Sequence, residues 1–155
     1  MIEIRQIERN EFQRAMEIAW ETFLEFEAEI YTKEGIKSFY DFIYDPLLEK
    51  MFLLGQYLIF GAFVDDKMVG VAGIRNRNHL SLLFVEREYH KMGIGNALVS
   101  HAFRYCYEAY RENTYTVNAA PYAVGFYHKM GFQDLSEEVK KDGIIYTPMR
   151  YFMGI

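Results

Sequence analysis

The chain has 155 residues, a length that fits one domain, and we expect residues 1–155 to form that single domain. The composition is 51% hydrophobic and 17% aromatic, which excludes a disordered chain. The formal charge of −5 argues against nucleic acid or an anionic membrane as the main partner, because both are bound through clustered Lys and Arg.

The chain carries no sign of export or membrane insertion. Met1–Arg5 lacks the basic and apolar regions of a signal peptide, so we expect a cytoplasmic protein. The most apolar stretch, 51–64, is about 14 residues long and too short to span a bilayer. Cys106 lies in a helical pattern, and we interpret it as a small packing residue.

The first 50 residues predict one strand and two helices. Ile2–Ile7 alternates apolar and polar residues, as a half-buried strand does, and Asn10 is a candidate N-cap for the helix that follows. Apolar residues recur at helical spacing over 12–26 and again over 36–43. The second helix should end before Pro46, because the residue before a proline disfavours the helical conformation.

The middle of the chain predicts three strands and a long helix. Tyr57–Val64 and Met68–Ile74 read as a hairpin around Asp65-Asp66-Lys67, and Leu80–Val85 as a third strand. Ile94–Tyr110 then has the apolar spacing of a helix.

The C-terminal part predicts a strand at Tyr115–Ala119 and a helix from about Tyr122 to Met130, with Gly131 as its C-cap. Two last strands flank the turn Asp142-Gly143. Pro148 should make the last strand an edge, or bulge it, because proline donates no ladder hydrogen bond. The order β-α-α-β-β-β-α-β-α-β-β predicts a mixed α/β sheet whose central strand-helix-strand unit has a right-handed crossover.

A glycine turn joins the third strand of this central region to the long helix. Gly93-x-Gly95 lets backbone N–H groups approach a phosphate at a helix start that carries a partial positive charge. Glycines at a helix start are also common turn formers, so this pattern alone is weak evidence. A dinucleotide fingerprint is disfavoured, because position 98 is Leu and the region Asn113–Tyr115 holds no acidic residue for a ribose.

A second motif follows about 25 residues on, with Asn118, Ala123, Tyr127 and Gly131-Phe132 at fixed spacing. Together the two motifs resemble the GNAT superfamily of acyl-CoA N-acetyltransferases. That family has (Arg/Gln)-x-x-Gly-x-(Gly/Ala) after its fourth strand, then Asn-x4-Ala-x3-Tyr-x3-Gly-Phe across its fifth strand and fourth helix. The first position of the loop departs from the pattern, because it is His90 here.

The resemblance implies an α/β fold of the GNAT type. Its mixed, mostly antiparallel sheet would have about seven strands with about four helices, splayed between strands 4 and 5. The implied activity is transfer of an acetyl group from acetyl-CoA to a primary amine by direct attack, without a metal. The alternative is a catalytically silent acyl-CoA-binding sensor or regulatory module. The sequence names neither the small-molecule or peptide acceptor nor the oligomeric state, and a homodimer stays open.

By the same resemblance, acetyl-CoA lies in the splay, with backbone groups at Phe84 and Val85 aligning its pantetheine arm. Main-chain N–H groups around 92–96 cradle the diphosphate, and Lys91 supplies nearby charge. Asn118 helps to place the cofactor or the departing thiol, unless it only caps a turn. The residues assigned to acetyl-CoA are thus Phe84, Val85, His90, Lys91, Met92, Gly93, Ile94, Gly95, Asn96 and Asn118.

Two residues are candidates for catalysis. Tyr127 matches the family tyrosine that protonates the departing sulfur, although a tyrosine here also suits a hydrophobic core. His79 is the titratable group nearest the place where some relatives carry a base; a solvent-exposed histidine and a water chain are the alternatives. His101 and His128 have no metal-ligand spacing, so we expect no metal site.

An acidic stretch precedes the hairpin region. If it borders the acceptor entrance, it favours cationic amines; otherwise it is a solvated helix face. Its carboxylates are Glu21, Glu25, Glu27, Glu29 and Glu34, with Lys33 as the counter-charge within the stretch.

Overall fold

The computed structural model describes residues 1–154, which form eight strands and five α-helices. The strands are β1 (Ile2–Gln6), β2 (Tyr57–Val64), β3 (Lys67–Arg75), β4 (His79–Val85), β5 (Thr114–Ala119), β6 (Gln133–Asp134), β7 (Val139–Lys141) and β8 (Ile144–Phe152). The helices are α1 (Phe12–Phe26), α2 (Lys33–Ile43), α3 (Pro46–Leu53), α4 (Ile94–Tyr110) and α5 (Val124–Met130). One sheet runs in the order β1-β2-β3-β4-β5-β8-β6, and β7 pairs with β8.

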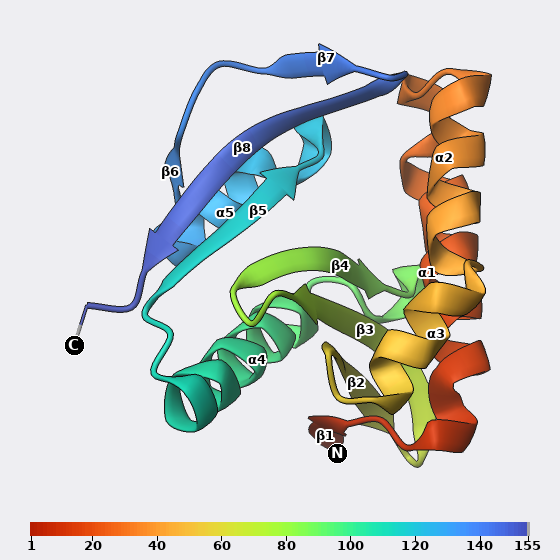
Figure 1. The fold of residues 1–155 in the computed structure, drawn as a ribbon, viewed down its shortest axis with the longest axis vertical. Helices are drawn as coiled ribbons and strands as arrows, with labels where there is room; N and C mark the ends of the chain where they lie inside the picture. The colour runs from red at the N-terminus through yellow and green to blue at the C-terminus, as the bar shows by residue number, and fades with distance from the viewer. Residues whose placement is uncertain (155) are drawn as a thin grey trace.

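The sheet is antiparallel except where β4 meets β5. These two strands are parallel, and their register contains only the pairs His79↔Thr116 and Leu80↔Val117. Beyond Leu80 they diverge, so that β5, β8, β7 and β6 form an arm angled away from β1–β4 (Figure 1). The mixed, mostly antiparallel sheet with a splay between the fourth and fifth strands is therefore confirmed.

The central strands bury both of their faces. Leu58 and Phe60 of β2 belong to a core shared with α4 and α5. Ile59 and Phe63 of the same strand belong to a second core with α1, α2 and α3. Because neighbouring side chains of a strand point to opposite faces, β2 needs a helix layer on each side. Figure 1 shows these layers, with α1–α3 along one side of the sheet and α4 on the other.

Helix α3 and strand β6 were not predicted. Pro46 does follow the end of α2, but it also occupies the first turn of α3, where a missing N–H leaves no hydrogen bond unmade. The Asp45 carboxylate caps this helix by accepting from the Leu47 N–H at 2.9 Å. Pro46 was therefore correctly taken as a sign that α2 ends before it, but the same proline also begins α3, which was missed.

Two local expectations were wrong. Asn10 is not an N-cap, because it lies within a short 3-10 turn, Arg9–Glu11, that precedes α1. There the Glu8 N–H donates to the Glu11 carboxylate at 2.7 Å. Pro148 does not lie on an edge strand, because β8 has neighbouring strands on both sides, and the register of β8 with β5 is continuous through it.

Pro148 is tolerated inside the sheet because of where the neighbouring strands stop. Its carbonyl faces the β6–β7 side and accepts from the Leu135 N–H at 2.8 Å. The backbone nitrogen of Pro148 faces the same side. There β6 has ended at Asp134 and β7 does not begin until Val139, so no strand offers a carbonyl to this nitrogen. No ladder hydrogen bond is therefore lost.

The β7–β8 hairpin docks on the start of α2. Asp142 and Gly143 both have positive φ, 54° and 77°, as the predicted two-residue turn requires. The Thr32 N–H donates to the Gly143 carbonyl at 3.3 Å, and a Cβ on Gly35 would overlap that carbonyl. The tip of the hairpin thus spans the splay and meets α2.

Gly35→Ala should reverse the usual effect of this substitution. In a helix, alanine is normally more stable than glycine by about 0.5–1 kcal/mol, but here the added Cβ must displace the Gly143 backbone. We expect a lower free energy of unfolding in urea. The matched control is Gly125→Ala in α5, where the new Cβ meets open space and the protein should be no less stable. Equal gains in stability at both positions would show that the hairpin is not docked on α2.

Candidate active site

A cavity of about 480 Å³, here named the α4 cavity, lies beside the start of α4. Its walls come from the C-terminal half of β4, the start of α4 and the segment from the 3-10 turn Pro121–Ala123 into α5. Thr22 and Phe26 of α1 close one side. The predicted cofactor residues that line it are Phe84, Val85, His90, Lys91, Gly93, Ile94, Gly95 and Asn96.

The start of α4 is built to accept an anion. Gly93 precedes the helix with φ 77°, and no side chain caps the helix within the described residues. The N–H groups of the first turn are therefore free of intrahelical partners and carry the positive end of the helix dipole. Gly95 faces Phe126, and a Cβ there would lie 3.4 Å from its ring. A diphosphate fits this combination of free donors and missing side chains.

Two of the predicted cofactor residues, Met92 and Asn118, lie outside the α4 cavity, and a third, His90, contacts the main chain. Met92 is 53% exposed and is not among the residues that line the α4 cavity. Asn118 is exposed and lines a different cavity, described below. His90 lies with Nε2 2.6 Å from the Val85 carbonyl oxygen, and because a carbonyl only accepts, Nε2 carries the proton.

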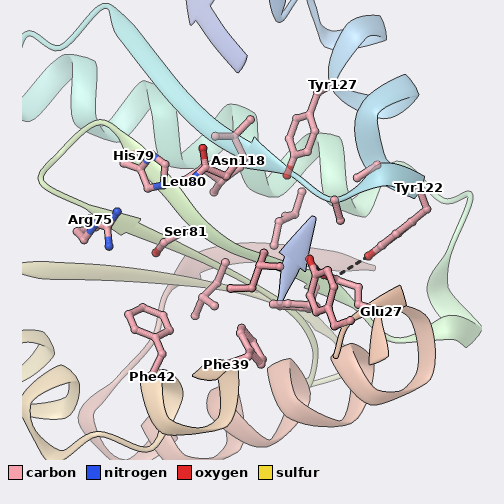
Figure 2. A pocket seen from close by; sticks show the side chains of 18 of the residues that line it. Glu27, Phe39, Phe42, Arg75, His79, Leu80, Ser81, Asn118, Tyr122 and Tyr127 are labelled. Carbon is pink, nitrogen blue, oxygen red and sulfur yellow. Dashed lines mark hydrogen bonds between the residues drawn. The ribbon is translucent and has the colours of Figure 1, made fainter. Parts of the chain in front are cut away.

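A second cavity, of about 280 Å³ and here named the α2 cavity, lies deeper in the splay (Figure 2). Ser38, Phe39 and Phe42 of α2 form one wall, and Ile144 of the hairpin contributes from the opposite arm. The two cavities share five lining residues: Leu83, Phe84, Tyr122, Ala123 and Tyr127. They therefore meet where β4 and β5 have separated.

Tyr127 stands at this junction. It is only 4% exposed, and its ring packs edge-on against Phe126 and Phe132, each at 5.1 Å. Its hydroxyl forms no hydrogen bond within residues 1–154. Every fully buried side-chain oxygen in that range does form one, so the Tyr127 hydroxyl is not fully buried. The hydroxyl therefore opens onto a cavity, as Figure 2 shows. Burial, together with the charge of Glu27, raises the pKa of the phenol.

His79 lies on the wall of the α2 cavity and is half-buried, so the picture of a freely solvated strand-end histidine is wrong. Its Nδ1 is 2.8 Å from the Thr116 hydroxyl, across the first of the two paired positions of β4 and β5. Burial, with the charge of Arg75, lowers the pKa of His79 to about 4. The imidazole is therefore neutral at pH 7.

Glu27 was placed by sequence reasoning in the acidic rim, and the structure places it elsewhere. It is 8% exposed, lines the α2 cavity and accepts hydrogen bonds from the Tyr31 and Tyr122 hydroxyls, both at 3.2 Å. Burial raises the pKa of this carboxyl. The sequence did hold a signal, because Glu27 follows Phe23 by four residues and so continues the apolar stripe of α1.

The remaining carboxylates of the acidic stretch are exposed. Some are neutralised by arginines from outside the stretch: Glu25 pairs with Arg87 at 3.2 Å and Glu21 with Arg14 at 3.4 Å. A solvated helix face describes them better than a free acidic rim does. Within residues 1–154 no group of His, Cys, Asp and Glu side chains is arranged to hold a metal ion. None of the helices in that range has the length and apolar character needed to cross a bilayer.

The sequence matches the family model of the acetyltransferase (GNAT) domain over residues 27–153. A comparison with curated proteins found no match. A GCN5-related N-acetyltransferase from Rhodopseudomonas palustris is similar in structure, with a TM-score of 0.81 at 20% identity over 97% of this chain and 94% of that one. The PaiA N-acetyltransferase from Thermoplasma acidophilum, in complex with coenzyme A, has a TM-score of 0.79 at 22% identity over 98% and 99%. A spermidine N-acetyltransferase variant from Vibrio cholerae has a TM-score of 0.67 at 14% identity over 98% and 94%.

The pKa of His79 predicts how stability depends on pH. The folded state holds the imidazole near pKa 4 and the unfolded chain near 6.5, so its contribution is complete above pH 6.5 and is lost as the pH falls towards 4. His79→Asn should therefore lose less thermal stability than the wild type between pH 7.5 and pH 5. Melting temperatures over this range test the difference. An NMR titration in which the His79 ring protonates near pH 6.5 would contradict it.

Proposed function

We propose that this chain, which belongs to the acetyltransferase (GNAT) family and is thus an acyl-CoA-dependent acetyltransferase, acetylates a primary amine where its two cavities meet. The observation that carries the proposal is the shared wall: Tyr127 lines both the α4 cavity and the α2 cavity. The first would hold the acyl donor and the second the acceptor. Both reactants would then reach the same phenol from opposite sides.

The residues of the α4 cavity fit coenzyme A. The free N–H groups at the start of α4 would bind its diphosphate, and the main chain at Phe84 and Val85 would align its pantetheine arm. Lys91 would add positive charge at the cavity mouth. When bound, acetyl-CoA supplies a thioester carbonyl that an amine attacks directly. Asn118 lines the α2 cavity and not the α4 cavity, which supports a role beside the departing thiol.

Tyr127 would donate its proton to the departing sulfur. A phenol near pKa 10 is a weaker acid than a thiol near 8.5 by about 2 kcal/mol, and burial raises the pKa of Tyr127 further. Donation must therefore accompany loss of a proton from the nitrogen. His79 is the base proposed from the sequence, but burial lowers its pKa to about 4, so its imidazole is a weaker base than a solvated histidine and carries no charge to attract an ammonium.

The α2 cavity suits an amine with apolar groups close to the reacting nitrogen, because Phe39, Phe42 and Leu82 lie along it. The spermidine N-acetyltransferase of similar fold is named for a polyamine. A cationic primary amine is therefore the acceptor class we propose for this chain, with the individual compound to be found by screening.

Gly95→Val should weaken acetyl-CoA binding while the fold is kept. The branched side chain would fill space between the start of α4 and the Phe126 ring, where the diphosphate would bind. We expect at least about a tenfold higher dissociation constant, or about 1.4 kcal/mol, by calorimetry. Gly125→Val, where the Cβ meets open space, is the matched control. Circular dichroism checks both folds, and equal affinities in all three proteins would refute the cradle.

Tyr127→Phe should keep acetyl-CoA binding and lose about 10²- to 10⁴-fold in turnover, because only the acidic hydroxyl is removed. Release of the coenzyme A thiol is measured over a panel of spermidine, free amino acids and a peptide N-terminus. Tyr105→Phe, a tyrosine of α4 that lines neither cavity, is the control and should behave as wild type. An activated aryl thioester, whose leaving group needs no proton, should suffer less from the change.

The same assay, together with melting temperatures measured with acetyl-CoA, NAD and ATP, separates the rival functions. Wild-type protein that gains thermal stability from acetyl-CoA but acetylates no amine of the panel would be a silent acyl-CoA-binding module. A gain from NAD or ATP in place of acetyl-CoA would indicate a nucleotide-binding protein. Full turnover in the Phe variant would return Tyr127 to a purely structural role.

A further inference from the structure

We propose that Glu27 is the residue that binds the ammonium group of the acceptor and removes its proton. This role rests on the proposed acetyl transfer and adds a catalytic residue to it. Such a group is needed because an amine of pKa near 10.4 is neutral in only about one molecule in 2,500 at pH 7.

Glu27 ends α1 at its C-cap and points into the α2 cavity beside Tyr122, as Figure 2 shows. Tyr122, which donates to one carboxylate oxygen at 3.2 Å, lines both cavities. The carboxylate is therefore held next to the junction where Tyr127 stands. The charge of Glu27 also contributes to the raised pKa of Tyr127, which places the base and the acid within electrostatic reach of each other.

Glu27 is 92% buried, yet within residues 1–154 no Lys, Arg or His side chain forms an ion pair with it. A carboxylate has about four acceptor sites, and the Tyr31 and Tyr122 hydroxyls occupy two of them. The remaining sites suit N–H donors, and an acceptor ammonium would bring both the donors and the missing positive charge.

The Glu27 carboxylate is poorly placed for stability. Burial disfavours its charged form, and the C-terminal end of a helix carries partial negative charge, which disfavours a carboxylate further. A glutamine could bond both tyrosines without an ionisable group, accepting from one hydroxyl at its Oε1 and donating to the other oxygen from its Nε2. A perturbed acid in a cavity, held at some loss of stability, is typical of a functional site.

The proton balance is complete with the groups present. Glu27 takes one proton from the ammonium, and the nitrogen lone pair forms the N–C bond to the acetyl carbon. The C–S bond breaks, and the sulfur receives the proton of Tyr127. The second nitrogen proton then restores the Tyr127 phenol, and Glu27 releases its own proton to solvent. The products are the acetamide, the coenzyme A thiol and one proton.

No other group that lines the α2 cavity should titrate between the pKa of His79, about 4, and that of the acceptor amine, about 10.4. The pKa values of the three tyrosine phenols are raised, chiefly by burial, and His79 titrates near 4. Arg75 lies with His79 at the far end of the cavity from Glu27 (Figure 2). These groups are Tyr31, Tyr122, Tyr127, His79 and Arg75.

The test is the pH profile of kcat/KM for Glu27→Gln, with spermidine as acceptor or the most active amine of the panel if spermidine is inactive. In the wild type the reactive pair is the carboxylate with the ammonium, so the profile should be flat between the two pKa values. Without the carboxylate only free amine reacts, so the variant should rise tenfold per pH unit towards pKa 10.4. At pH 7 the loss should be about 10²- to 10⁴-fold.

Two further variants fix the interpretation. Glu27→Asp keeps a carboxylate and should retain the flat profile at a lower rate, which serves also if the Gln variant folds poorly. Glu29→Gln, an exposed neighbour in the same stretch, should match the wild type. A Gln variant whose profile is lowered without change of shape would assign Glu27 a structural role and overturn the inference. Absence of turnover in the wild type with every amine would instead overturn the acetyl transfer itself.

Discussion

The active site depends on how early the pairing between β4 and β5 ends. Two parallel residue pairs join the strands, and after Leu80↔Val117 their backbones separate. A sheet that stayed paired would place β5 against the second half of β4 and leave no room for ligands. Because the strands diverge, the space between them is bounded instead by side chains of α1, α2 and the α5 arm. The result is two cavities with one wall in common.

The charges around this space are arranged in a definite order. The start of α4 offers uncapped N–H groups to an anion at one end of the α4 cavity. The polar groups at the junction include the Tyr127 hydroxyl and the carboxylate of Glu27, which accepts a hydrogen bond from Tyr122. Negative donor phosphates and a positive acceptor would thus be attracted to separate regions, while both reacting groups meet at a phenol. This polarity gives each reactant one preferred direction of entry.

The sequence predicted those features that depend on residues close together in the chain. The glycine turn before α4 and the spacing from Asn118 to Tyr127 are local patterns, and most strands and helices follow from apolar periodicity. Helix α3 was missed because Pro46 ends one helix and starts another. The position of Glu27 on the apolar stripe of α1 is a local signal of its burial, but its partner Tyr122 is 95 residues away, and no local rule brings the two together. Pro148 was misjudged because the gap between β6 and β7 is set by a tertiary register.

Two links across the splay show why a functional carboxylate is tolerated there. At one, the Gly143 backbone of the hairpin packs on Thr32 and Gly35 of α2 and accepts the Thr32 N–H. At the other, Tyr122 donates to Glu27. The first link is made by backbone groups and close packing, so it does not change with pH. The arm is therefore held against α2 whichever protonation state Glu27 adopts, and the carboxylate is free to gain and lose a proton during turnover without opening the site.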